Sequence, residues 1–498
     1  MQTATIILHP RLPQRRTRLA RLGDWMARHR RAILAVQWVI VVFYLVLVAL
    51  PAFLPHPHPE ARLFSSDFGA TSAIDRSVCT TGALNPTPTE KAAYLACWQD
   101  RLVLLAQYLF WGVWWPFVIL SIMLMGRVWC GVLCPEGALA EFASRHGRGG
   151  AIPKWMRWGG WPVVAFILTT VYGQLVSVYD YPQAALLILG GSTVAAVGVG
   201  WMYGKGKRVW CRYLCPVSGV FSLLARIAPV HFRIDRAAWD AHPQRSAAVD
   251  CAPLLDVKHM KGAGQCHACG RCSGHRDAVT LAVRSPNAEI LDAGGDMPRT
   301  NEAVLLLFGM LGVAMGAFQW TVNPWFVRGK QAAADWLVAR DILWPLGDSP
   351  AWWLLTRYPE AGDVFTWLDG AAILIWISMY AIVLGGFAWL TVRAAAHLAG
   401  VDWRRLALGL VPLAGIGLFL GLSMMSATHL RAEGVHLGWL TPLRAALLVI
   451  GLGWSASLGW QLVRVGASGT AARGIAGLLW LLPLAAVGAS WWLTFFVW

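Results

Sequence analysis

Charged side chains are scarce in this sequence. Asp, Glu, Lys and Arg make up only 14% of its 498 residues, whereas 57% are hydrophobic and 30 are Trp. Soluble globular domains carry charge on about 25% of their residues, so this composition excludes that class. With a mean hydropathy of +0.51, the sequence predicts an all-α polytopic membrane protein.

Long apolar runs supply the expected membrane spans. A helix needs about 20 apolar residues to cross the hydrocarbon core of a bilayer. Nine runs approach or exceed that length, so we expect about nine transmembrane helices. Their ranges are 32–54, 102–125, 159–179, 183–203, 303–322, 364–392, 406–426, 443–463 and 475–496.

A cleavable signal sequence is also missing. The first apolar run is too long for a signal core and ends at residues 51–55 without a small-x-small cleavage site. Lys and Arg are retained on the cytoplasmic side of short loops, and placing residues 1–31 inside puts 32 of the 42 basic residues there. We therefore expect a multi-pass protein of the bacterial inner (cytoplasmic) membrane with a cytoplasmic N-terminus. The net charge of +16 then reflects topology and attraction to membrane lipid, and no nucleic-acid binding is expected.

Four segments follow from this pattern. A basic cytoplasmic N-terminus (1–31) precedes helices one to four (32–204), a polar cytoplasmic segment (205–300) and helices five to nine (301–498). Only the polar segment is large enough on the inside for a small folded domain. We expect a ferredoxin-like insertion there, with one strand in the alternating stretch 278–283.

One short motif occurs twice, 81 residues apart. Arg127 to Pro135 reads RVWCGVLCP and Arg208 to Pro216 reads RVWCRYLCP. Each copy follows an apolar run, and both lie at the inner ends of parallel helices, so the two can meet. Thiolates at this Cys-x3-Cys-Pro spacing beside a membrane indicate iron–sulfur ligation.

A second group of cysteines lies in the polar segment. Cys266, Cys269 and Cys272 form a Cys-x2-Cys-x2-Cys run, the front of a ferredoxin cluster motif, and Cys251 precedes them. A structural zinc site is the rival, but zinc motifs usually separate two Cys-x2-Cys pairs by a dozen or more residues.

Eight inside cysteines match two [4Fe-4S] clusters. The simplest partition gives one cluster to the repeated motif and one to the polar segment. Alternatively, Cys134 or Cys215 completes the second cluster, as in two-cluster ferredoxins, and Cys251 joins the first. Neighbouring basic residues, Arg127, Arg208, Arg212 and Arg271, would either raise the cluster potentials or anchor the membrane edge. The predicted iron ligands are Cys130, Cys134, Cys211, Cys215, Cys251, Cys266, Cys269 and Cys272.

The paired motifs and the Cys-rich stretch resemble the membrane polyferredoxins of the NapH, NosR and CcoG type, over about residues 102–287. The resemblance implies [4Fe-4S] clusters that transfer electrons to or from the quinone pool or a periplasmic partner. The chain departs from the pattern because no Cys-Pro follows Cys272 and because five helices follow the cluster segment. The outside loop 55–101 is too short for a flavin domain, so flavin is not expected.

The leading functional interpretation is a membrane-bound electron-transfer protein, as a quinol-dehydrogenase-like component of an oxidoreductase. It would relay electrons between a cytoplasmic-side donor or quinol and a membrane or periplasmic redox partner protein. Two alternatives stay open: an accessory protein that supplies electrons for maturation of a metalloenzyme, and a redox sensor. No catalytic residue is predicted.

Three further sites are expected outside the cluster region. Cys79 and Cys97 lie on the oxidising side, which favours a disulfide between them. A polar set near the outer side could hold a quinone head, although such residues more often bond neighbouring helices. Its members are Gln107, Tyr172, Gln174 and Asp180.

Haem is not expected, because no two histidines can face each other within the spans. His429 and His436 lie together near the outer junction of helices seven and eight. They are candidates for a surface metal or haem, with ordinary loop histidines as the alternative.

Overall fold

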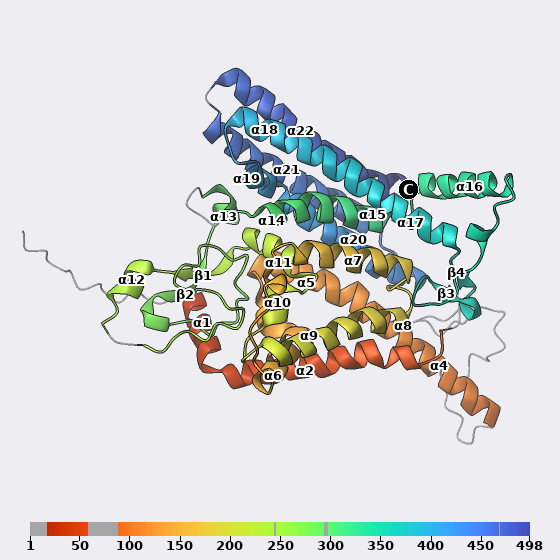
Figure 1. Cartoon of the computed structure of the whole chain (residues 1–498), viewed down its shortest axis with the longest axis horizontal. Helices are drawn as coiled ribbons and strands as arrows, with labels where there is room; N and C mark the ends of the chain where they lie inside the picture. The colour runs from red at the N-terminus through yellow and green to blue at the C-terminus, as the bar shows by residue number, and fades with distance from the viewer. Residues whose placement is uncertain (1–16, 58–87, 244–245, 293–296, 468) are drawn as a thin grey trace, which may run out of the picture.

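The computed structural model describes residues 17–57, 88–243, 246–292, 297–467 and 469–498. Within this part, eight helical segments are long and apolar enough to cross a membrane, and they run side by side (Figure 1). The expected all-α polytopic membrane fold is therefore confirmed. The segments are built from α2 (Arg30–Ala49) and η1 (Pro51–Phe53); α4 (Pro88–Gln107), η2 (Tyr108–Trp114) and α5 (Trp115–Met125); α8 (Pro182–Ala185), η5 (Leu186–Gly190) and α9 (Gly191–Tyr203); α14 (Thr300–Val304), η8 (Leu305–Val313) and α15 (Ala314–Gln319); α17 (Trp367–Tyr380), η11 (Ala381–Gly385) and α18 (Gly386–Ala399); α19 (Trp403–Ala407), η12 (Leu408–Leu410) and α20 (Val411–Ala432); α21 (Leu440–Gly466); and α22 (Thr470–Trp492) with η13 (Leu493–Val497).

One expected span is shorter than the sequence indicates. The apolar run 159–179 forms only α7 (Trp161–Leu175), a helix of 15 residues. The chain leaves the helix at Val176 and turns at Ser177, whose φ is +49°. Hydropathy alone did not show this turn, because the residues in it are as apolar as those of the helix.

The helices after residue 300 belong to the same core as those before it. The α19–α20 segment is the most enclosed, with 83% of its most apolar stretch buried inside the protein. It packs against α5 and η2 on one side and α21 on the other. The second half of the chain therefore covers the first half and is not an appendage.

The cysteine motifs and the polar segment gather at one end of the bundle, the left end in Figure 1. We call this the cysteine end. The predicted strand is present as β2 (Val279–Val283), which pairs antiparallel with β1 (Val230–Ile234), a strand that the sequence did not reveal. The other elements at this end are α1 (Arg18–Arg28), η3 (Trp129–Leu133), α6 (Pro135–Arg145), η4 (Trp155–Arg157), α10 (Val209–Tyr213), α11 (Ser218–Leu224), η6 (Ala225–Ile227), α12 (Arg236–Ala241), η7 (His275–Asp277) and α13 (Ala288–Leu291).

The N-terminal helix α1 is part of this region. It packs against β2, and at Gly23 a methyl group would lie 2.7 Å from the Ser273 hydroxyl oxygen and 3.0 Å from Leu281 Cβ. Part of the segment expected as a basic N-terminus thus supplies a wall of the polar insertion.

The opposite end of the bundle carries the Trp-rich segment 323–363. Its elements are α16 (Pro324–Val338), η9 (Trp344–Leu346), β3 (Arg357–Tyr358), η10 (Pro359–Ala361) and β4 (Asp363–Val364). Cys79 lies outside the described residues, so its disulfide with Cys97 stays a prediction.

Candidate metal centre

Eight cysteines at the cysteine end surround two separate cavities. We call the first the motif cavity; it measures about 130 Å³ and is lined by Cys130, Cys134, Cys211 and Cys215. We call the second the loop cavity; it is lined by Cys251, Cys266, Cys269 and Cys272. All eight cysteines are free thiols. The structure therefore brings together the two sets of the simplest partition.

The first motif copy positions its cysteines at the start of a helix. Cys130 lies in the wide turn η3, and Cys134 caps the N-terminus of α6, with Pro135 in the first helical position. The Cys134 sulfur accepts a hydrogen bond from the Gly137 N–H at 3.4 Å. Pro suits this position because its missing N–H has no partner there in any helix. The helix N-terminus and the N–H group both favour negative charge on sulfur.

The two motif copies are tied together by their arginines. Arg208 of the second copy donates to the Cys130 carbonyl of the first. Arg127 of the first copy donates to the Ser218 hydroxyl at 2.9 Å, and that hydroxyl donates to the Cys211 carbonyl at 2.8 Å. Each copy thus holds the first cysteine of the other, a reciprocal arrangement that fits the sequence repeat.

The loop cavity lies directly against the motif cavity. A methyl group on Gly131, next to Cys130, would lie 2.0 Å from the His267 carbonyl oxygen and 2.8 Å from the Cys269 nitrogen. Only a glycine permits this approach of the two backbones. Gln37 of α2 donates to the Gly131 carbonyl at 2.9 Å and so fixes the contact from a third segment.

The surroundings of both cavities carry excess positive charge. The side chains of Arg127 and Arg208 are only 4% and 1% exposed. Glu141 accepts from Arg208 at 2.9 Å and from Arg271 at 2.5 Å. Burial by itself would raise the pKa of Glu141, but the two guanidinium groups outweigh it and lower the pKa to about 2. Arg271 also pairs with Asp250 at 3.5 Å and Glu136 lines the motif cavity, whereas Arg127 donates to two neutral acceptors.

Several buried nitrogens in this region have no hydrogen-bond partner among the residues that the structure describes. They are Arg127 Nε, Arg208 Nη2 and His267 Nδ1. Buried cations and unpaired donors are costly unless an anionic group lies nearby. A [4Fe-4S] cluster held by four thiolates is such a group, so the residues present fit it.

The thiols themselves are poor acids. Burial raises the pKa of Cys211 and of Cys266 to about 12 in each case, and it also raises the pKa of Cys215 well above its usual range. Metal binding must therefore release protons, because only thiolates ligate iron. Among the described residues, no three His, Cys, Asp or Glu side chains converge on a single metal ion. Each set of cysteines surrounds a hollow instead, as a centre of several atoms requires.

The other predicted polar residues mainly bond neighbouring segments. Gln107 donates to the Asp180 carbonyl at 2.5 Å, Tyr172 donates to the Trp353 carbonyl, and Gln174 accepts from the Trp320 indole at 2.7 Å. Their role in quinone binding stays a prediction.

The two candidate outer histidines have different surroundings. His429 lies in the last turn of α20 and packs edge-on against the Tyr108 ring, with centroids 6.0 Å apart. His436 is exposed in the following loop. A metal at these residues stays untested.

The sequence analysis missed two supporting residues, Gln37 and Glu141. Both are polar groups in largely apolar or small-residue helices, and both are 4% exposed. Polar residues buried near membrane spans are functional candidates by default, and that signal would have singled out Gln37. Glu141 faces Arg145 one helical turn later at 2.6 Å, so it is easily mistaken for an ordinary surface pair.

Comparison with known proteins identifies the motif region. The model of the 4Fe-4S binding domain matches residues 108–153 and 188–235, which contain both motif copies. The chain carries a 4Fe-4S binding domain. This domain supplies the four cysteines of the motif cavity, whereas Cys251 to Cys272 lie beyond the matched residues.

Two curated relatives share part of the chain. The regulatory protein NosR of Pseudomonas aeruginosa is 26% identical over 180 residues, which cover 32% of this chain and 25% of NosR. The putative electron transport protein YccM of Escherichia coli is 23% identical over 235 residues, 41% of this chain and 64% of YccM. The chain thus spans less than two thirds of either relative. No solved structure matches it.

These findings confirm the resemblance to membrane polyferredoxins. The chain is a polytopic membrane protein with a match to the 4Fe-4S binding domain, and one of its relatives is named as a putative electron transport protein.

Proposed function

We propose that this protein relays single electrons between a redox partner at the cysteine end and a quinone within the membrane. One [4Fe-4S] cluster would occupy each cysteine cavity, with the four lining cysteines as ligands. The cysteine end would face the cytoplasm of a bacterial inner membrane, and the predominance of Lys and Arg in the segments at this end supports that orientation.

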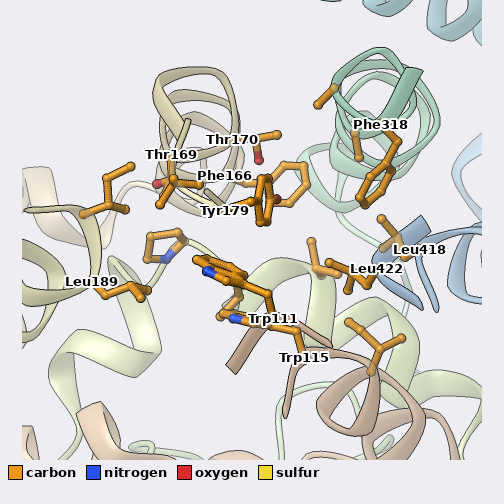
Figure 2. A pocket seen from close by; sticks show the side chains of 18 of the residues that line it. Trp111, Trp115, Phe166, Thr169, Thr170, Tyr179, Leu189, Phe318, Leu418 and Leu422 are labelled. Atoms are coloured by element: carbon orange, nitrogen blue, oxygen red, sulfur yellow. The ribbon is translucent and has the colours of Figure 1, made fainter. Parts of the chain in front are cut away.

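The observation that carries the proposal is a third, apolar cavity beside the motif cavity. It measures about 150 Å³, and Figure 2 shows aromatic and aliphatic side chains around a common hollow, among them Trp111, Phe166 and Phe318. An apolar cavity of this size can hold a benzene-sized ring. The apolar cavity and the motif cavity share the lining residues Trp115, Thr169, Ile188, Leu189, Pro216, Val217 and Phe221. A ring bound there would lie next to the Cys215–Pro216 turn.

The apolar cavity also offers a polar group for a quinone oxygen. The indole N–H of Trp115 is buried and has no hydrogen-bond partner among the described residues. Ligand sites of this kind are mostly apolar, with a few polar groups that fix orientation. A quinone carbonyl would accept from this N–H and so relieve the cost of an unpaired buried donor.

The chain's own residues keep the electron path short. The contact of Gly131 with the His267–Cys269 backbone holds the loop cavity against the motif cavity. Arg127, Arg208 and Arg271 favour the more negative, reduced state of whatever the cysteines hold. When bound, an iron–sulfur cluster supplies one-electron transfer at a potential that these groups tune.

The test is quinol reduction of the purified, cluster-loaded protein. In the variant Leu422→Trp, a large ring fills the apolar cavity from α20 without touching a cysteine. We expect a short-chain quinol to reduce the wild-type clusters and to fail with this variant. The matched control is Leu168→Trp on α7, where the side chain is 63% exposed on the outside of the protein.

A second variant tests the proposed hydrogen bond. Trp115→Phe keeps an aromatic ring and removes the N–H group. We expect the quinol KM to rise about tenfold, the value of one lost hydrogen bond, with little change in cluster content. Equal reduction of the wild-type, Leu422→Trp and Leu168→Trp proteins would disprove the quinone site while leaving the clusters in place.

A further inference from the structure

We propose a binding site for a phosphate group in a basic pocket at the cysteine end. The pocket measures about 120 Å³ and lies between the loop before α7, the start of α14, and the segment from α10 to α11. Four arginines line it: Arg127, Arg157, Arg212 and Arg299. The proposed relay does not require this site, although Arg127 lines both the pocket and the motif cavity.

The floor of the pocket is formed by buried cations. Arg127 is 4% exposed and donates to two neutral acceptors, the Gly264 carbonyl at 3.1 Å and the Ser218 hydroxyl at 2.9 Å. Its Nε is buried and has no partner among the described residues. Arg212 donates to the neutral Gln265 side chain at 2.9 Å. Neither floor arginine is therefore neutralised by a carboxylate in the described part of the chain.

The arginines also repel one another. The guanidinium group of Arg212 is repelled by those of Arg299 and Arg127. The one acidic residue in the lining is Glu302. Its carboxylate accepts from the Arg226 guanidinium group at 2.8 Å and from the backbone N–H of Arg299 at 3.1 Å. Like charges gathered without a free counterion are unfavourable unless an anion joins them.

A phosphate group matches this arrangement best. Arginine binds phosphate through paired N–H groups, and its planar guanidinium group suits the tetrahedral anion. The pocket also has neutral donors in Ser222 and Asn301. The positive charge of Arg127 would then be shared between this pocket and the motif cavity, which it also lines.

The position of the pocket suits the phosphate of an anionic phospholipid. Its lining includes Pro162 and Leu305, which lie at the first residues of the apolar helices α7 and η8. Trp158 at the mouth is 55% exposed, as is typical of indoles at the headgroup level. Basic pockets between helices on the cytoplasmic side recognise such headgroups. Free inorganic phosphate has the same chemistry and is the other source of a phosphate group for this pocket.

The experiment uses the full cluster-loaded protein in nanodiscs of phosphatidylglycerol and phosphatidylcholine in equal amounts. Native mass spectrometry counts the lipids that stay bound after release. The test variant carries Arg157→Gln and Arg299→Gln, two exposed positions away from the cysteines. The control carries Arg236→Gln and Arg464→Gln, which remove the same charge from exposed positions elsewhere at this end. Iron content serves as the check that each variant is folded.

We expect wild type and control to retain phosphatidylglycerol in preference to phosphatidylcholine. The test variant should lose this preference by about tenfold or more, because each lost charge-assisted bond to phosphate is worth about that factor. In parallel, equilibrium dialysis with labelled inorganic phosphate is run on lipid-free protein in detergent. Phosphate binding without phosphatidylglycerol retention would support the site with free phosphate as its source. If the test variant and the control retain both ligands equally, the proposal is wrong.

Discussion

The motif cavity and the loop cavity are each lined by four cysteines, but different kinds of structure hold the two sets. The motif cavity is built from two similar helix ends, and each copy's arginine bonds to the other copy. The loop cavity is built from the irregular segment 246–277, with β1, β2 and α1 as supports. The thiols of the motif cavity come from two copies of one motif, whereas those of the loop cavity come from one irregular segment that β1 and α1 support.

The two cavities also differ in how they meet solvent. Cys130 and Cys211 are 7% and 5% exposed, and membrane helices surround them. Near the loop cavity, Asp250 is half exposed and pairs with Arg30 at 3.2 Å and Lys207 at 2.7 Å. The motif cavity is thus suited to a partner inside the membrane, and the loop cavity to one in solution.

The largest effects should come from single cysteines, one in each cavity. We expect Cys211→Ser to remove the cluster of the motif cavity and about half of the iron, and Cys269→Ser to remove the other half. In Cys269→Ser the segment 246–292 should also become sensitive to protease, because metal ligation supplies much of the folding energy of so small a region. Iron and sulfide analysis with low-temperature EPR measures the loss. If either change removed both signals, the partition of ligands between the cavities would be wrong.

Glu141 joins the two cavities, so its loss should affect both. Glu141→Gln leaves Arg208 and Arg271 without their carboxylate, and removal of one partner from a buried ion pair costs about 3–5 kcal/mol. We expect a lower thermal midpoint and faster loss of both clusters on heating. Glu360→Gln, an exposed residue at the opposite end, is the control and should leave the midpoint unchanged. Selective loss from one cavity would show that Glu141 does not connect them.

Lowering the pH should remove the stabilising contribution of Glu141 gradually. The pKa of Glu141 falls from 4.5 to about 2 in the folded protein, so its ion pairs stabilise the fold fully above about pH 4.5. This contribution declines as the pH falls from there towards 2. We expect wild type and Glu141→Gln to differ most in thermal midpoint near neutral pH, and the difference to shrink in acid. A difference that stays constant down to the lowest pH would contradict the ion-pair explanation.

The contact at Gly131 should be sensitive to a single methyl group. Gly131→Ala forces the Cys130 segment away from His267 and Cys269, and overpacking of this kind costs about 1–3 kcal/mol. Electron exchange between the clusters should slow, as measured by freeze-quench EPR. The control Gly198→Ala meets no atom within 4 Å and should behave as wild type. An unchanged rate of electron exchange in Gly131→Ala would mean that electrons pass between the clusters through a different contact.

The smallest effect should come from Arg30. Its ion pair with Asp250 is half exposed on both sides, and such pairs contribute about 0–1 kcal/mol. Arg30→Gln should therefore shift the thermal midpoint far less than Glu141→Gln. An equal shift would show that α2 supports the loop cavity more strongly than the exposed geometry indicates.

Hydropathy alone predicted most of the membrane architecture. Eight of the nine expected runs form helices long enough to span, and only α7 is shorter. The strand at 278–283 was predicted from its alternation, whereas β1 was missed although Val230, Phe232 and Ile234 alternate with His231 and Arg233 in the same way. The role of α1 was hidden as well, since a short basic helix has the same composition as a free terminus.

The sequence by itself determined the class of the protein and the identity of its eight inside cysteines. Both depend on local sequence patterns, namely apolar runs and cysteine spacings of three or four residues. Only the tertiary structure decided which four thiols share a cavity, which arginines lack a counterion and where an apolar hollow reaches the motif cavity. These properties depend on contacts between residues more than ninety positions apart, such as Gln37 with Gly131 and Gly131 with His267. No local pattern records such contacts, because they arise only when the helices pack.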